Sequence, residues 1–211
     1  MAYDEDEQQE RFQQWWQENW KALAAGLVIG IGGIFGWNAW QSHQEQQAEA
    51  ASVVFTEMSA AVDAGQLQKA TELQQSLVDA HSGSPYAVAA SMRLAAARAS
   101  GGEFEAAAGL LRWSKEHADD EAMRQLAQLR LARVLWAQEK VDEALTLLDE
   151  PLGPYVAAAA ELRGDILVAQ DKRAEARSAY EEALASAPRE GRELLQQKLD
   201  DLADVAEAQD A

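Results

Sequence analysis

Sixteen residues from Ala22 to Trp37 carry no charged or polar side chain, and this run limits the possible folds more than any other feature of the sequence. Extended to Trp40, it covers roughly 19 residues, which as an α-helix are about 30 Å long, the thickness of the hydrocarbon core of a bilayer. Tryptophan settles at the headgroup boundary because its indole ring joins an apolar body to one N–H group. We predict a transmembrane helix over residues 22–40. Its predicted membrane-interface anchors are Trp15, Trp16, Trp20, Trp37 and Trp40.

Two alternatives to an anchor are a buried helix of a soluble protein and a cleaved signal peptide. Five glycines in the run oppose the first alternative, because glycine weakens a helix in water but is tolerated in lipid. A signal peptide begins with a basic region and ends at a small-residue cleavage site, whereas this chain has acidic residues at positions 4–7. A retained anchor is the favoured interpretation.

Lysine and arginine near the ends of the predicted span indicate its direction. Arg11 and Lys21 precede it, and no lysine or arginine follows until Lys69. Because positively charged flanks stay in the cytoplasm, we predict a cytoplasmic tail over residues 1–21, with an interfacial aromatic segment, and a translocated domain over residues 41–211. That domain lies in the periplasm if the source is a Gram-negative bacterium.

Small residues recur every four positions within the apolar run. Such stripes let another transmembrane helix approach closely, so we expect these positions to pack against a partner helix. The alternative is that glycine is simply frequent in membrane helices. The residues are Ala22, Gly26 and Gly30 in one stripe, and Gly32 and Gly36 in a second.

The remainder of the chain shows helical periodicity. Runs of about 12–20 residues, rich in Ala, Leu, Gln and Glu, lie between breakers such as Gly65, the pair at 101–102 and Pro188. The pattern predicts about nine helices and no convincing strand.

An internal repeat organises these predicted helices. Residues 129–151 align with residues 161–188 at an offset of 32, and with residues 92–111 at an offset of 37. Two helices that pack about 8–10 Å apart need a small residue where they cross, and most of the aligned positions carry one. The positions that we predict to pack the repeats are Ala95, Ala107, Ala132, Ala144, Leu148, Gly164, Ala176 and Tyr180.

This spacing of small residues, followed by a large one and a closing Pro188, resembles the tetratricopeptide repeat. The resemblance implies an all-α fold in which the transmembrane helix precedes an α-solenoid of about four tetratricopeptide-like helical hairpins. Beyond Pro188, Leu195, Leu199 and Leu202 form an apolar stripe, which predicts a C-terminal capping helix over the exposed end of the repeats.

The sequence offers little for catalysis. Cysteine is absent, and the three histidines, His43, His81 and His117, are isolated and lack metal-ligand spacing. The glycine pair at 101–102 lacks the Lys and the Ser or Thr of a phosphate loop. We therefore expect no enzyme activity, no metal, no cofactor and no small-molecule substrate. An envelope enzyme with a diffuse active site is the alternative from another functional class.

The net charge and two tryptophans indicate which kinds of partner the chain can bind. A formal net charge of −18 repels phosphate backbones, so we expect no nucleic-acid binding. A solenoid can hold peptides or helices in its groove, and Trp113 and Trp136 are candidate groove residues. Packing in the core is the favoured alternative for both.

The chain also carries signatures of a particular family. Near the predicted span these are Trp15-Trp16, Glu18-Asn19 and Lys21-Ala22-Leu23, then Gly36-Trp37-x-x-Trp40-x-Ser42-His43-Gln44, and in the repeats "LRLARV" at 129–134 and "ELRGDIL" at 161–167. With these features the chain resembles the YfgM-like family, the ancillary subunit of the SecYEG translocon, over nearly its whole length.

The resemblance implies a single-pass type II protein of the bacterial inner membrane, with its repeat domain in the periplasm and its span in contact with membrane lipid. It implies association with the SecYEG translocon and the periplasmic chaperone PpiD, and help in passing emerging proteins to periplasmic chaperones. The alternatives are a scaffold or assembly factor for another envelope complex, and a regulator that binds a cytoplasmic partner through residues 1–20.

Overall fold

The structure is a computed structural model that describes the backbone of residues 3–209 and the side chains of residues 15–17, 19–21, 24, 26–27, 29–189 and 191–202. Within this described part every regular element is a helix, and no strand occurs. The α-helices are α1 (Tyr3–Asp63), α2 (Leu67–His81), α3 (Pro85–Ser100), α4 (Phe104–His117), α5 (Glu121–Ala137), α6 (Val141–Asp149), α7 (Val156–Ala169), α8 (Arg173–Ser186) and α9 (Arg192–Gln209), with short 3-10 helices η1 (Gly153–Tyr155) and η2 (Arg189–Gly191).

The chain divides into two compact units, residues 1–49 and residues 50–211, and the boundary falls within α1. The first unit is helical from Tyr3 onward. Across the side chains that the structure describes, no helix combines the length and apolarity needed to cross a membrane. Part of the predicted tail and four residues of the predicted span have side chains outside the described set; the four are Ala22, Leu23, Ala25 and Val28.

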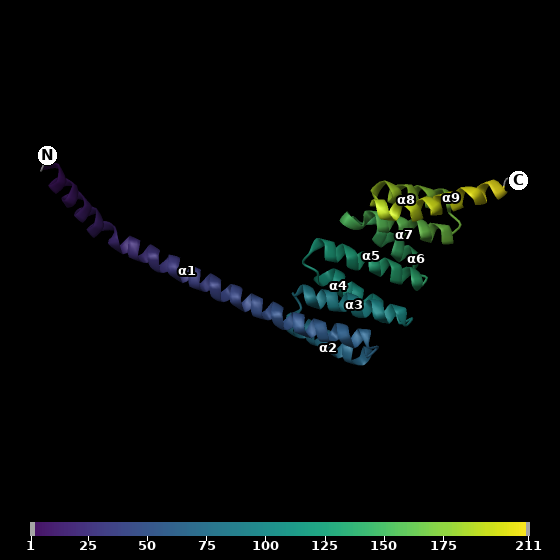
Figure 1. Ribbon diagram of the computed structural model, residues 1–211, viewed down its shortest axis with the longest axis horizontal. Helices are drawn as coiled ribbons and strands as arrows, with labels where there is room; N and C mark the ends of the chain where they lie inside the picture. The colour runs from purple at the N-terminus through teal and green to yellow at the C-terminus, as the bar shows by residue number, and fades with distance from the viewer. Residues whose placement is uncertain (1–2, 210–211) are drawn as a thin grey trace. The chain divides into compact units, whose positions relative to one another are not determined.

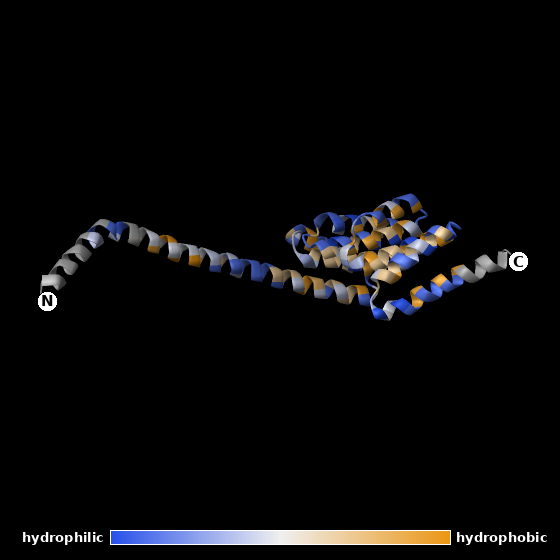
Figure 2. Cartoon of the chain, turned by 90° about the horizontal axis from the view of Figure 1, so that it is seen from above, coloured by the Kyte–Doolittle hydropathy of each residue, from blue (hydrophilic) through white to orange (hydrophobic). Residues whose placement is uncertain are grey.

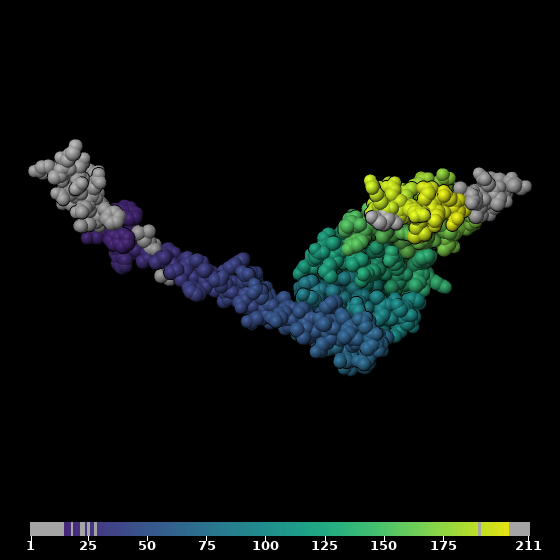
Figure 3. Space-filling view, viewed as in Figure 1, coloured from purple at the N-terminus to yellow at the C-terminus, as the bar shows by residue number. Residues whose placement is uncertain are grey.

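The second unit is a stack of helical hairpins (Figure 1). The last turns of α1 share a buried cluster with α2, and α3 pairs with α4, α5 with α6, and α7 with α8. The predicted all-helical solenoid of tetratricopeptide-like hairpins is therefore confirmed. In Figure 3 the residues of α9, in yellow, cover one end of this stack.

The four hairpin turns share one backbone geometry. Each contains a residue with positive φ, namely Gly65 (69°), Gly102 (80°), Glu139 (63°) and Asp171 (59°). In each case the next N–H donates to the carbonyl five residues earlier, at 2.8–2.9 Å, which is how a left-handed residue ends a helix. The turns follow one another at 37, 37 and 32 residues, the offsets at which the sequence repeats.

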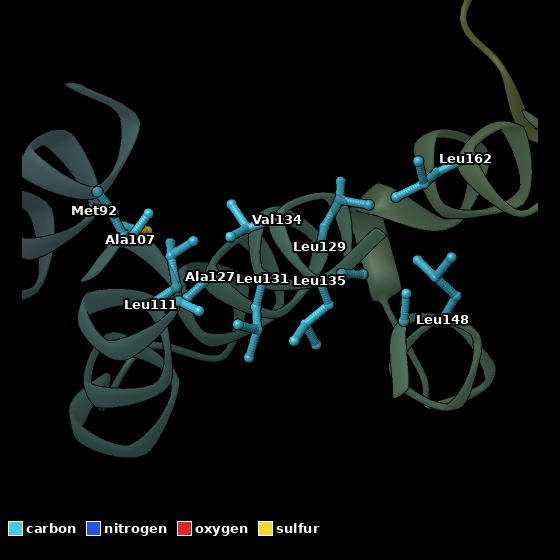
Figure 4. Packing of buried hydrophobic residues seen from close by; sticks show 14 of the residues in the cluster. Met92, Ala107, Leu111, Ala127, Leu129, Leu131, Val134, Leu135, Leu148 and Leu162 are labelled. Carbon is cyan, nitrogen blue, oxygen red and sulfur yellow. The ribbon is translucent and has the colours of Figure 1, made fainter. Parts of the chain in front are cut away.

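Helix α5 lies at the centre of the largest buried cluster (Figure 4). Leu131 and Leu135 belong to this cluster together with Leu111 of α4 and Leu148 of α6. Residues of α3 and α7 join the same cluster, so each hairpin is packed on the next. This nearest-neighbour packing is what a repeat solenoid requires.

Candidate protein-binding surfaces

The first candidate surface is an apolar stretch of α1 in the first unit. Its described large side chains are exposed, and Ile29 is exposed to 75%. Trp37 and Trp40 lie side by side with ring centroids 5.2 Å apart. Figure 2 shows orange, hydrophobic patches along this stretch, followed by blue, hydrophilic residues. The exposed residues are Leu27, Ile29, Ile31, Ile34, Phe35, Trp37 and Trp40.

A continuous apolar surface of this kind is a site for a membrane or a protein partner. The predicted anchors that precede it, Trp15, Trp16 and Trp20, are about half exposed. A methyl group placed on any of the predicted packing glycines would meet no other side chain or distant backbone within 4 Å; these are Gly26, Gly30, Gly32 and Gly36. Both glycine stripes are therefore free of neighbours within the described part of the chain, and the side chain of Ala22 lies outside the described set.

The predicted repeat-packing residues lie inside the second unit. Seven of them are buried where successive helices cross, which are Ala95, Ala107, Ala132, Ala144, Leu148, Ala176 and Tyr180. The eighth, Gly164, is buried against the ring of Tyr180. They hold the helices of the repeat domain together, and none of them lines either of the two grooves that are described below.

A polar network joins the capping helix to the last hairpin. The Tyr180 hydroxyl donates to Oδ1 of Asp165 at 2.7 Å. Lys198 Nζ, from α9, donates to the same oxygen at 2.6 Å and to Oε1 of Glu161 at 2.8 Å. The ammonium group also lies 5.4 Å from the centroid of the Tyr180 ring.

This network shifts the titration of two of its members. Burial, together with the hydrogen bond to Asp165, raises the pKa of Tyr180 above its ordinary value. Burial lowers the pKa of Lys198, but its hydrogen bonds to Asp165 and Glu161 outweigh that effect, so its pKa is raised. These contacts could not be predicted from the sequence, because α7, α8 and α9 each supply one or more of the residues.

A groove of about 410 Å³, which we call the α5–α7 groove, lies beside this network. Arg133 and Trp136 of α5 line one side, and Glu161, Leu162 and Asp165 of α7 line the other. Trp136 is partly buried against the central cluster and also reaches the groove, so both sequence-based interpretations of this residue apply.

A second groove of about 480 Å³, the α4–α6 groove, lies over α5 between α4 and α6. Its apolar part consists of Leu131, Leu135 and Leu147. Polar and charged side chains surround this part, namely Arg112, Lys115, Glu116, Glu143 and Thr146. An apolar base with a polar rim is the usual anatomy of a protein-binding surface.

Trp113 occupies a different place. It is partly buried between the central cluster around α5 and the cluster that α1, α2 and α3 share. Its ring stacks on that of His117, with the ring centroids 4.4 Å apart. Trp113 lines neither groove and serves in packing. Among the side chains that the structure describes, no three His, Asp or Glu residues are arranged to hold a metal ion.

Comparison with known families adds to this geometry. Residues 13–204 match the model of the tetratricopeptide repeat-like domain family. Tetratricopeptide-like repeats of a putative kinesin light chain from Podosopora anserina superpose with a TM-score of 0.53 at 22% identity, covering 79% of this chain and 88% of that one. That likeness concerns the fold alone.

Curated relatives resemble the chain over almost its full length. The Haemophilus influenzae relative is 32% identical over 205 residues, covering 96% of this chain and all of its own. The Escherichia coli K12 relative is 33% identical and covers 87% and 88%, and that of Neisseria gonorrhoeae is 34% identical and covers 96% and 100%. All three are named ancillary SecYEG translocon subunits.

Proposed function

The chain belongs to the family of ancillary SecYEG translocon subunits, and from that membership we propose that it is a membrane-anchored protein-binding scaffold at the translocon. The observation that carries the proposal is identity of 32–34% to proteins of that name over most of both chains. A tetratricopeptide-like solenoid supports a binding role, since such folds present grooves to protein segments.

The proposed anchor is a transmembrane helix over residues 22–40, with residues 1–21 in the cytoplasm and residues 41–211 in the periplasm. The exposed apolar side chains of α1 between residues 27 and 40 support it, because such a surface is stable in lipid. Arg11 and Lys21 on the amino-terminal side support the type II orientation in the inner membrane. Tryptophans on both sides support headgroup boundaries at the two ends of this proposed span.

Topology has a direct test because the chain contains no cysteine. Gln8→Cys and Ser178→Cys each introduce a single thiol, one in the proposed cytoplasmic tail and one on the exposed side of α8. In intact spheroplasts a membrane-impermeant maleimide should label Cys at 178 alone, and permeabilisation should expose both. Labelling at position 8 before permeabilisation would refute the orientation.

The proposed task of the repeat domain is to bind emerging proteins or their chaperones, PpiD among them, and to assist the transfer between the two. The two grooves support this role, because each offers apolar contacts beside charged groups to a protein segment. The arrangement supports binding without chemistry.

Photo-crosslinking in membranes tests the function. A benzophenone amino acid at Thr146, in the α4–α6 groove, and at Ala137, one turn beyond the arginine of the α5–α7 groove, should capture translocon subunits and the chaperone. The same group at the exposed Ser178 of α8 is the matched control and should capture fewer partners. Capture of components of another envelope complex, and of neither expected partner, would refute the proposal in favour of a different scaffold role.

A further inference from the structure

Among the side chains that the structure describes, two arginines on the central helix α5 lack the ion pairs that most basic residues of the repeat domain possess. Residues 41–211 contain 30 acidic and 16 basic side chains, so carboxylates are abundant. Ten of the lysines and arginines lie within 4.0 Å of a carboxylate. Arg130 and Arg133 have neither an ion pair nor a hydrogen bond among the described side chains.

The position of these two arginines connects them with a groove. They are three residues apart on α5 and therefore lie on one side of the helix. Arg133 is exposed and lines the α5–α7 groove, and Arg130 is partly buried one turn earlier. Trp136 and Leu162, which line the same groove, offer an apolar surface next to the guanidinium group of Arg133.

The acidic residues across the groove are already bound by other groups. Asp165 and Glu161 accept hydrogen bonds from Lys198 at 2.6 and 2.8 Å, and Asp165 also accepts one from Tyr180. Lys198 partly neutralises these two carboxylates and ties them to α9. Within the described part of the chain, Arg133 in the groove and Arg130 one turn earlier thus have no ion pair, although carboxylates line the other side of the groove.

We propose that the α5–α7 groove binds an acidic segment of a partner protein, with carboxylates on Arg130 and Arg133 and a neighbouring apolar side chain against Trp136 and Leu162. This inference rests on the proposed scaffold function and names the chemistry of its partner. Arginine binds carboxylates through paired, charge-assisted hydrogen bonds, and arginine and tryptophan are enriched among the residues that dominate protein interfaces.

The overall charge of the domain makes this site selective. An acidic segment is repelled by most of a surface that carries a net negative charge, so it gains attraction only where free cations are clustered. The binding should therefore be local, and it should depend on salt.

A peptide binding assay on the full chain in detergent micelles tests the inference. The probe is a fluorescein-labelled 12-residue peptide of alternating glutamate and leucine, and its companions carry glutamine or lysine in place of glutamate. Fluorescence anisotropy should show binding of the glutamate peptide alone. Arg130→Gln/Arg133→Gln should weaken that binding at least tenfold, as the loss of a charged hydrogen bond commonly does.

A matched control is present in the same domain. Arg189 and Arg192 are likewise three residues apart, exposed, and without an ion pair among the described side chains. Arg189→Gln/Arg192→Gln removes the same charge outside the groove and should leave the affinity within twofold of the wild type. Arg133→Gln alone, at an exposed position, decides the question if the partly buried Arg130 proves necessary for folding.

Three outcomes would overturn the inference: no binding of the glutamate peptide, equal weakening by both double variants, or preference for the lysine peptide. Its failure can be separated from failure of the proposed function. Crosslinks to translocon subunits with no binding of the glutamate peptide would refute only the groove chemistry. Binding of that peptide at Arg130 and Arg133, with no such crosslinks, would refute only the translocon role.

Discussion

A methyl group at Gly164 would clash with Cε1 of Tyr180, so the tyrosine ring occupies the space that any side chain at position 164 would need. The ring itself is held by the hydrogen bond from its hydroxyl to Asp165. The close approach of α7 and α8 thus depends on a glycine on one helix and an anchored aromatic ring on the other.

Gly164→Ala should destabilise the repeat domain by about 1–3 kcal/mol, the usual effect of overpacking a core. Gly109 in α4 is the matched control, because a methyl group there would meet nothing within 4 Å. Gly109→Ala should raise the stability by up to about 1 kcal/mol through helix propensity. Urea unfolding followed by circular dichroism measures both changes, and wild-type stability of Gly164→Ala would contradict the assigned packing.

Glu139→Gly should stabilise the protein by about 1 kcal/mol, because φ at this turn is 63° and a left-handed backbone is strained for a residue with a side chain. The preceding Gln138 has a φ of −88°, so Gln138→Gly should give no gain. Thermal melts of the two variants make the comparison. If Glu139→Gly were less stable than the wild type, the contacts of the Glu139 side chain would stabilise the fold by more than the left-handed backbone destabilises it.

Stability should fall as the pH rises above about 10. The pKa of Lys198 is raised from its ordinary value of 10.5, so the folded state retains a proton that the unfolded chain releases. The raised pKa of Tyr180 acts in the same direction. The stabilisation is thus complete below the unfolded pKa and is lost as the pH rises through the folded one.

Unfolding curves between pH 9 and 12 measure this loss. The double variant Tyr180→Phe/Lys198→Met should show a shallower fall than the wild type. Lys172→Met, at an exposed lysine with no ion pair among the described residues, should keep the wild-type slope. If stability fell equally steeply with pH in the wild type and in the double variant, the network of Tyr180 and Lys198 would not be the cause of the fall.

Ile31→Lys/Ile34→Lys should release the chain from membranes, because a lysine at the centre of a spanning helix costs about 2.5–3.5 kcal/mol. Val53→Lys is the control, since Val53 is also an exposed apolar residue of α1 but lies beyond the proposed span. Alkaline extraction of membranes followed by immunoblotting separates bound from released protein. Retention of the double variant would exclude residues 22–40 as the anchor.

The repeat was readable from the sequence because each crossing needs a small residue at a fixed interval. The offsets of 32 and 37 residues predicted the hairpins correctly, and the breakers at Gly65 and near 101–102 coincide with turns of positive φ. Glu139 and Asp171 occupy the same place in later turns. Neither was predicted to be left-handed, because their residue types do not require it.

The polar contacts of Tyr180 could not be predicted from the pattern of the sequence. Periodicity shows that a residue faces the interior, but it does not show which polar groups from other helices meet it there. Tyr180 and Lys198 lie on different helices, and only the stacked arrangement brings both to one carboxylate oxygen of Asp165. The α5–α7 groove depends on the same stacking of helices, so the residues that line it could not be predicted from the sequence either.

Helix α9 also determines where the solenoid stops. Its Leu195 covers an apolar end formed by Ala160, Tyr180 and Ala183, and Lys198 fastens it in place. Without this cover, the apolar end of the last hairpin would be exposed to water. Repeat proteins need a terminal cap with a polar outer face to remain soluble. By pairing with Glu161 and Asp165 of α7, Lys198 thereby links the solubility of the repeat domain to one polar contact at its end.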